Sequence, residues 1–285
     1  MAAGREFLGE AAARLDSNKH QAEDSPWPAY YSARLYKRLR KPEAEPRLRE
    51  AVRLLEQRGE VSFAAKAQIE LADFLRRKRR QESAGIALEQ AFQLAQASED
   101  PQDLLATQYH QARLWLDQGQ DLGRAYLLLH QVYKTIMPEW PDRQLQRNCL
   151  SALASVSYEL GRYGEAQDYR DQQLKNAEQA GTSTANARYN LAVLEIARGK
   201  ADETSKTRAI VALHQAKEAA RAVDDRLIEG HTRHLLGRLI AGAEGGRQLE
   251  RCLRIAGEIG DTDLQSECYA ALAVNRLPES QEAAR

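Results

Sequence analysis

The sequence predicts an all-α fold in which helical hairpins repeat along the chain and stack into a solenoid. Seven of the eight prolines lie at or before Pro141 and the eighth is Pro278, so the long stretch between them can be helical throughout. Apolar residues in that stretch recur at spacings of three and four, as in Leu150, Leu153 and Leu160. Small residues also return about every forty positions. Alternating runs typical of strands are nearly absent, so no sheet is expected.

The composition restricts the class of protein. The 41 Lys and Arg balance the 41 Asp and Glu, so any attraction to a charged partner must be local. Cys149, Cys252 and Cys268 are odd in number and far apart, which favours thiols in a reducing compartment over a disulfide framework. No apolar run reaches the roughly 18 residues of a membrane helix, and residues 1–10 lack an apolar leader. We therefore expect a cytoplasmic protein.

The two ends of the chain differ from its middle. Residues 1–26 are expected to form an N-terminal segment, with a possible capping helix over 5–16 followed by a polar loop. Residues 27–277 form the predicted repeat domain, in which 27–40 and 47–58 make a first hairpin. Residues 278–285 are polar and lack periodicity, so they are expected to be a loose tail.

A leucine or glutamine followed by a small residue marks each successive repeat. The places are Leu71-Ala72, Gln111-Ala112, Leu153-Ala154, Leu191-Ala192, Leu236-Gly237 and Leu272-Ala273, at intervals of 40, 42, 38, 45 and 36. Seven residues after the small residue come Gly119, Gly161 and Gly199 in three repeats, and Arg79 and Glu244 in the other two. A second small residue follows the turn at Ala84, Ala125 and Ala166, and at Ala209 or Ala212 in the fourth repeat.

The spacing of the small residues has a physical reason. Two helices joined at a tight turn approach to about 8 Å only where the side chains at their crossing are small. A hairpin cannot bury its own apolar face, whereas a stack of hairpins can, so a solenoid is the expected product. Between repeats, Ser98-Glu99-Asp100-Pro101 is predicted to end one helix and cap the next.

Residues 150–166 resemble the tetratricopeptide repeat (TPR) family, with Leu153-Ala154, Gly161, Tyr163 and Ala166 at the family's positions. Residues 186–199 are similar to the first helix of the longer repeats of kinesin light chains, and longer repeats also occur in bacterial regulators. The resemblance covers 60–277 and implies a right-handed superhelix of six to seven antiparallel hairpins. The period of about 40 exceeds the family's 34, and the usual proline at repeat ends is absent.

The resemblance also implies a concave groove lined by the first helix of each hairpin. Its positions lie six, three and two residues before the small crossing residue, and one and four after it. The expected groove residues are Tyr109, His110, Arg113, Asn148, Tyr158, Asn186, Tyr189, Asn190, His231, His234 and Arg238, with Ser151, Ser155 and Ile196 beside them. Asparagine can hydrogen-bond to the backbone of an extended peptide, tyrosine can pack against its apolar side chains, and arginine can pair with its carboxylates. Alternatively, the tyrosines belong to the core and Asn186 and Asn190 bond to neighbouring helices.

Two basic clusters form a candidate basic edge. The first is Arg34, Lys37, Arg38, Arg40 and Lys41, and the second runs from Arg76 through Arg77, Lys78 and Arg79 to Arg80. Both lie near the end of a first helix, where cations favour the negative end of the helix dipole. The two clusters have three interpretations: solvated helix ends, a surface for an acidic protein partner, or a surface for nucleic acid or a targeting function.

No catalytic constellation is present, so we expect neither enzymatic activity nor a cofactor. The chain lacks a phosphate-binding loop, an HExxH helix and a CxxC pair. The glycine-rich stretch from Gly242 to Gly246 is interpreted as a turn. His231 and His234 lack a third metal ligand. Cys252 and Cys268 are interpreted as buried thiols. The predicted function is a protein-interaction scaffold that binds a peptide in its groove. The alternative is a nucleic-acid-associated or signalling regulatory module that uses the basic edge.

Overall fold

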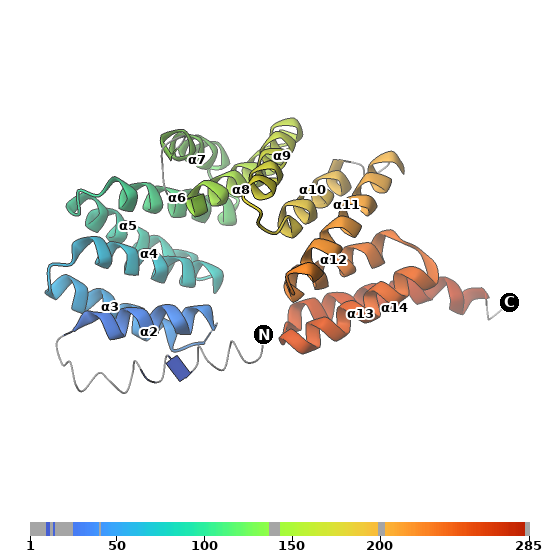
Figure 1. The fold of residues 1–285 in the computed structure, drawn as a ribbon, viewed down its shortest axis with the longest axis horizontal. Helices are drawn as coiled ribbons and strands as arrows, with labels where there is room; N and C mark the ends of the chain where they lie inside the picture. Colours follow the sequence, from blue (N-terminus) through green and yellow to red (C-terminus); the bar gives the residue numbers. More distant parts are fainter. Residues whose placement is uncertain are drawn as a thin grey trace. The chain divides into compact units, whose positions relative to one another are not determined.

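The computed structural model describes residues 10–11, 14, 25–39, 41–136, 143–198 and 203–282, and every regular element in these ranges is an α-helix (Figure 1). The helices are α2 (Pro26–Arg38), α3 (Ala44–Gln57), α4 (Val61–Arg77), α5 (Gln81–Ala97), α6 (Pro101–Gln118), α7 (Leu122–Ile136), α8 (Arg143–Glu159), α9 (Tyr163–Gln179), α10 (Ala185–Arg198), α11 (Glu203–Ala222), α12 (Arg226–Leu239), α13 (Gly242–Ile259) and α14 (Thr262–Glu282). The predicted all-α class is confirmed.

Consecutive helices pair as hairpins, and the hairpins stack. The chain forms two compact units, Met1–Ala152 and Leu153–Arg285, and the boundary falls inside α8. In the first unit α2 contacts α3, α4 contacts α5 and α6 contacts α7, while α2, α4 and α6 also contact one another in succession. In the second unit α10, α12 and α14 form the same kind of row. First helices thus touch first helices, which is the arrangement of a solenoid.

The small residues lie where the pattern predicts close helix contact. Ala72, Ala112, Ala154 and Ala192 are each at most 2% exposed. Ala84, Ala125 and Ala166, which follow the turns, are equally buried. In the fourth repeat Ala209 is fully buried, and Ala212 is partly buried and packs against the cluster that contains Ala192. Ala273 is exposed, because the described part of the chain has no helix after α14 to pack against it.

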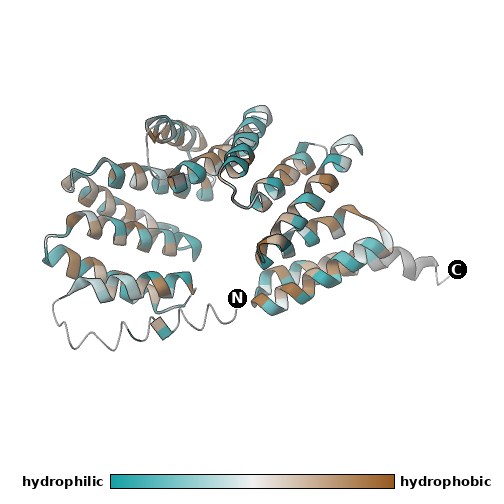
Figure 2. Cartoon of the chain, in the orientation of Figure 1, coloured by the Kyte–Doolittle hydropathy of each residue, from teal (hydrophilic) through white to brown (hydrophobic). Residues whose placement is uncertain are grey.

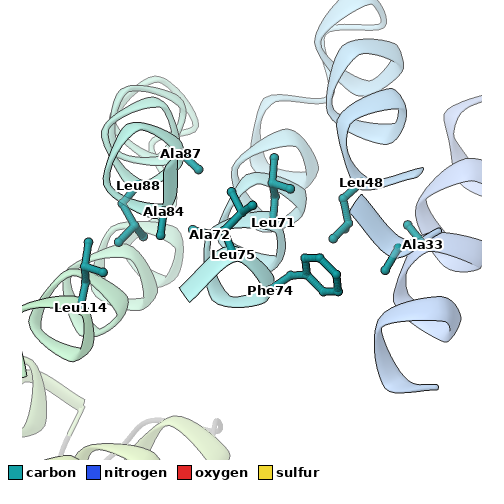
Figure 3. Packing of buried hydrophobic residues seen from close by; sticks show 11 residues of the cluster. Ala33, Leu48, Leu71, Ala72, Phe74, Leu75, Ala84, Ala87, Leu88 and Leu114 are labelled. Atoms are coloured by element: carbon teal, nitrogen blue, oxygen red, sulfur yellow. The ribbon is translucent and has the colours of Figure 1, made fainter. Parts of the chain in front are cut away.

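The leucines beside the small residues fill the space between hairpins. In the first unit, Leu48 of α3, Leu75 of α4, Leu88 of α5 and Leu114 of α6 belong to one buried cluster around Ala72 (Figure 3). Hydrophobic and hydrophilic residues alternate along the described helices (Figure 2). Burying a leucine side chain contributes about 2 kcal/mol, so these leucines contribute substantially to the stability of the stack.

The turns within hairpins use left-handed backbone. Gly119 and Gly161 have φ of 65° and 73°, which glycine adopts without the steric cost that other residues incur. Arg79, at the same place in its hairpin, has φ of 58° and takes the same conformation. Gly199 lies outside the described residues. Between hairpins, Asp100 caps α6 by accepting a hydrogen bond of 2.9 Å from the backbone N–H of Gln102, as the sequence predicts.

The glycine-rich stretch before α13 differs from the prediction of a simple turn. Only Gly242 has a positive φ, at 71°, and it is already the first residue of α13. Gly245 and Gly246 lie inside the helix. A Cβ atom at Gly245 would meet the carbonyl oxygen of Ile240 and approach that of Gly237 to 2.9 Å. Gly245 therefore serves the crossing of α12 and α13, and not a turn.

The C-terminal end of the helical part lies beyond the predicted boundary at 277. Helix α14 continues through Pro278 to Glu282. A proline removes one backbone hydrogen bond and kinks a helix, but the helix can continue past it. At the other end, Glu10, Ala11 and Arg14 are helical, and the rest of the expected capping helix over 5–16 lies outside the described residues.

The cysteines differ from the expectation of three separate thiols. The structure joins Cys252 of α13 to Cys268 of α14 as a disulfide, and both side chains are fully buried. Cys149 is also buried and is not part of a disulfide. Sequence spacing alone did not indicate the pair, because sixteen positions and a turn separate the two residues. None of the described helices combines the length and apolar character needed to cross a membrane.

Two adjacent glycines provide a matched test of the crossing. Gly245→Ala is expected to lower the free energy of unfolding by about 1 to 3 kcal/mol, because its Cβ meets backbone oxygens that cannot move aside. Gly246→Ala is expected to be neutral or stabilising by up to about 1 kcal/mol, since its Cβ has only an ordinary contact of 3.9 Å. Urea unfolding of both variants measures the difference. Equal effects would mean that α12 and α13 do not cross at Gly245.

Candidate functional site

A pocket of about 630 Å³ lies within the first unit, on the side formed by the first helices. It is lined by Tyr30, Tyr31, Arg34 and Lys37 of α2, by Phe63, Lys66, Ile69, Glu70, Asp73, Arg76 and Arg77 of α4, by Ala106, Tyr109, His110 and Arg113 of α6, and by Asn148 of α8. We call it the α2–α8 pocket. The second helices α3, α5 and α7 contribute no residue to it.

The lining follows the groove positions that the repeat implies. Counted from the crossing residue Ala72, the five offsets give Lys66, Ile69, Glu70, Asp73 and Arg76, and all five line the pocket. Counted from Ala33, which is fully buried, they give Trp27, Tyr30, Tyr31, Arg34 and Lys37, and all except Trp27 line the pocket. The sequence-based list contained none of these as groove residues. The sequence did contain the signal for them, because the same offsets applied to the first two hairpins give these residues.

Four predicted groove residues do meet in the pocket, namely Tyr109, His110, Arg113 and Asn148. Tyr109 is only 7% exposed, so this tyrosine also belongs to the core, as the alternative interpretation proposed. Its ring lies 5.0 Å from that of His110 in an edge-on arrangement. The pocket wall at α6 is therefore a packed, preorganised surface.

The other predicted groove residues lie apart from this pocket. On α10, the Asn190 side chain donates a 3.1 Å hydrogen bond to Asn186 Oδ1, so the two amides pair with each other. The ring of Tyr189 lies 6.3 Å from that of His231. Tyr158 of α8 packs with its ring 5.6 Å from Tyr163.

His234 and Arg238 of α12 line a separate pocket of about 750 Å³ in the second unit. Its other lining comes from α12, the turn before α13, and α14. His234 Nδ1 lies 3.6 Å from Glu267 Oε2. Within the described ranges, no three His, Cys, Asp or Glu side chains gather closely enough to hold a metal ion.

Asp73 is the electrostatic centre of the α2–α8 pocket. Its buried carboxylate lies 2.9 Å from Lys37 Nζ and accepts hydrogen bonds of 2.9 Å from Arg76 and 3.0 Å from Arg77. Burial alone would raise the pKa of Asp73, but the charges of Lys37 and Arg77 and the hydrogen bonds to it outweigh burial and lower the pKa well below its usual range. The carboxylate therefore stays ionised and fixes three cations.

These ion pairs change the interpretation of the basic edge. Lys37 from the first cluster and Arg76 and Arg77 from the second meet at Asp73, so the clusters do lie together. Arg76 also pairs with Asp117, and Arg80 pairs with Glu45 at 2.7 Å. The edge is thus a network of ion pairs more than a row of unpaired charges.

The remaining members of the basic edge contribute differently. The Lys78 ammonium lies 5.8 Å from the centre of the Phe74 ring, and Arg79 forms the left-handed turn. Arg38 and Lys41 are exposed, and Arg40 lies outside the described residues. These positions are consistent with solvated helix ends, one of the three interpretations.

Two arginines in the pocket are held only loosely. Arg34 is about half exposed, and its Nε lies 3.9 Å from Glu70 while its guanidinium stands over the Tyr30 ring at 5.6 Å. Arg113 contacts Asp117 at 3.9 Å, and its buried Nε has no hydrogen-bond partner among the described residues. Six cations and two carboxylates line the pocket in all, so its walls favour an anion.

An aromatic group forms one end of the pocket. The Phe63 ring lies 4.7 Å from Trp27 and 6.0 Å from Tyr30, both edge-on, and Tyr30 lies 5.4 Å from Tyr31. Lys66 extends over Phe63, with Nζ 5.2 Å from the ring centre, and approaches the buried Asp103 to 3.4 Å. The α2 end of the pocket thus offers apolar area beside positive charge.

The comparisons with known proteins concern the fold. No protein-family model and no curated protein sequence matches the chain. A signal transduction ATPase with numerous domains (STAND) protein with a tetratricopeptide repeat sensor, from Pyrococcus horikoshii, is 15% identical with a TM-score of 0.63. That match covers 94% of this chain and 41% of the other, so the chain spans about two fifths of the STAND protein.

Two smaller proteins also share the fold. BtubC (BKLC) from P. vanneervenii is 17% identical with a TM-score of 0.52, over 82% of this chain and 88% of the other. A putative kinesin light chain from Podospora anserina with nearly identical TPR-like repeats is 18% identical with a TM-score of 0.50, over 75% and 96%. The chain is an all-α solenoid of helical hairpins. More particularly, its fold is TPR-like, which confirms the expected resemblance at the level of the fold.

His110 provides a pH test of the pocket. Burial lowers the pKa of His110 to about 4, with Lys37, Arg76 and Arg113 acting in the same direction and Asp73 opposing them. Because an exposed imidazole titrates near 6.5, the unfolded chain binds more protons below that pH, and stability falls as pH drops from about 6.5 toward 4. We expect His110→Gln to remove about 2 kcal/mol of the stability loss between pH 7 and pH 5. Urea unfolding across this range measures it, and a slope equal to that of the wild type would contradict a buried neutral His110.

Proposed function

We propose that the chain is a non-enzymatic interaction module that holds an extended segment of a partner protein in the α2–α8 pocket. The observation that carries the proposal is that most of the residues at the groove offsets of three successive first helices line one pocket, with an excess of cations. A segment lying across α2, α4 and α6 would touch the same register position in each repeat. Such a surface is suited to an extended chain.

The chemistry of the pocket specifies the kind of segment. Arg34 and Arg113 present guanidinium groups that are only loosely engaged, and each can form a bidentate pair with a carboxylate. Phe63 and Tyr31, which is 46% exposed, offer an apolar shelf for a large side chain. The amide of Asn148 can both donate to and accept from a peptide backbone. We therefore propose a segment that carries acidic residues and an aromatic or aliphatic anchor.

The nucleic-acid alternative receives less support from the geometry. Binding a phosphate backbone requires several cations that can each neutralise a phosphate. In the basic edge, Lys37, Arg76, Arg77 and Arg80 already pair with carboxylates. The proposed module can also serve as the sensor part of a larger signalling protein, which is the role that the description of the STAND protein gives to its repeats.

A peptide-display selection with the full chain tests the pocket. We expect enriched peptides to contain acidic residues beside an aromatic or aliphatic residue, and the double variant Arg34→Gln/Arg113→Gln to bind them at least about tenfold more weakly. The control is Arg53→Gln/Arg58→Gln, which removes the same charge from α3 and its C-cap residue, outside the pocket.

Salt separates the proposed function from its rival. Peptide binding through two arginines is expected to weaken less than about tenfold between 50 and 200 mM salt, because few counterions are released. Enrichment of peptides that lack acidic residues, or an equal loss of peptide affinity in the two double variants, would contradict the proposal. Tight binding of a 20-nucleotide strand with a loss of about a thousandfold or more over this salt range would favour the nucleic-acid alternative.

A further inference from the structure

A second charged pocket, of about 400 Å³, lies within the second unit and is lined by residues of α11, α12 and α13. It is lined by Arg221 of α11, by Arg226, Glu229 and Arg233 of α12, and by Arg251, Arg254, Ile255 and Glu258 of α13. Five guanidinium groups and two carboxylates therefore surround one small space. We call it the arginine pocket.

The floor of the arginine pocket is a buried hydrogen-bond network. Glu229 and Arg233 are 4% and 5% exposed, and both Nε and one terminal nitrogen of Arg233 donate to Glu229 Oε1, at 3.0 and 2.7 Å. The other terminal nitrogen of Arg233 donates to Gln248 Oε1 at 2.8 Å. Gln248 in turn donates to Glu244 at 2.7 Å. This network ties α12 to α13 and fixes the base of the pocket.

The rim of the pocket carries the cations that remain available. Arg226 contacts Asp224 at 3.1 Å and Glu229 at 3.4 Å, and Arg221 contacts the exposed Glu218 at 3.4 Å. Arg251 and Arg254 are exposed and form no ion pair with any residue in the described ranges. The exposed carboxylate on the wall is Glu258, which opposes the binding of an anion.

The arginine pocket is separate from the groove positions of the second unit. On α12, Arg226, Glu229 and Arg233 recur at spacings of three and four along one face. His231, His234 and Arg238 recur in the same way along another face, and His234 and Arg238 line a different pocket. A ligand of the arginine pocket therefore leaves those groove positions open.

The rim arginines come from three helices, and this restricts the anion that they suit. A carboxylate is planar and has one unit charge, so one or two guanidinium groups satisfy it, as Arg233 and Arg226 do with Glu229. A phosphate group is tetrahedral, carries a charge of about −1.5 to −2, and offers three acceptor oxygens in different directions. Four rim arginines, contributed to one pocket by α11, α12 and α13, match the phosphate better. Without an anion they repel one another.

From this arrangement we propose that the arginine pocket binds a phosphate-bearing anion, with Arg251 and Arg254 as its main ligands and Arg221 and Arg226 at the sides. The buried Glu229–Arg233–Gln248 network positions the two helices, and Arg233 itself stays engaged with Glu229. The site is independent of the peptide pocket in the first unit. Loss of one of the two binding activities does not imply loss of the other.

The test is a calorimetric titration of the full chain with inorganic pyrophosphate at low ionic strength. We expect saturable binding by the wild type, and binding at least about tenfold weaker by Arg251→Gln/Arg254→Gln. Glu258→Gln is expected to bind about two- to threefold more tightly, because it removes a like charge from the wall. The matched control is Arg198→Gln/Arg208→Gln, two exposed arginines of the same unit outside the pocket.

Each outcome decides for or against the pocket. Absence of binding by the wild type, or an equal loss in the control pair, would overturn the proposal, because binding would then be absent or would follow net charge alone. Circular dichroism of each variant shows whether it is folded, and the exposed positions are expected to leave the helical signal unchanged. A parallel titration with phosphoserine identifies the source of the phosphate. Binding tighter than that of pyrophosphate assigns the site to a phosphorylated side chain, and weaker binding assigns it to a free polyphosphate.

Discussion

The close approach of two helices at a pair of small residues is the contact on which this fold depends. Where Ala72 faces the small residues of α5, or Gly237 meets Gly245 of α13, no side chain holds the helices apart. The neighbouring leucines can then reach the next hairpin and bury their area against it. Without the small residues each hairpin would open, and the row of first helices would lose its spacing.

That spacing also produces the α2–α8 pocket. Because successive first helices touch in the same register, equivalent positions converge on one side of the first unit. Asp73 neutralises part of the positive charge and holds Lys37 and Arg77 in place, which leaves Arg34 and Arg113 as the looser cations. The fold thus accounts for where the pocket lies, and the ion pairs account for which of its charges are available to a ligand.

The sequence was sufficient to predict the repeat, because the small residues, the turn glycines and the cap at Asp100 are local signals. It also implied the groove positions, although the groove offsets were not applied to the first hairpin, which contains Tyr30. Pairing across the fold was not predictable in this way: Lys37 and Asp73 lie 36 positions apart, and composition does not show which cations have partners. The disulfide between Cys252 and its partner was missed for the same reason.

A double-mutant cycle between Gly237 and Leu249 tests the close approach most directly. A Cβ atom at Gly237 would stand 2.8 Å from Leu249 Cδ2, so Gly237→Ala should cost about 1 to 3 kcal/mol in the wild type. Leu249→Ala removes the obstructing side chain, and in that background Gly237→Ala should cost at least about 1 kcal/mol less. Additive effects, within about 0.5 kcal/mol, would mean that the two helices do not meet at this glycine and would contradict the account.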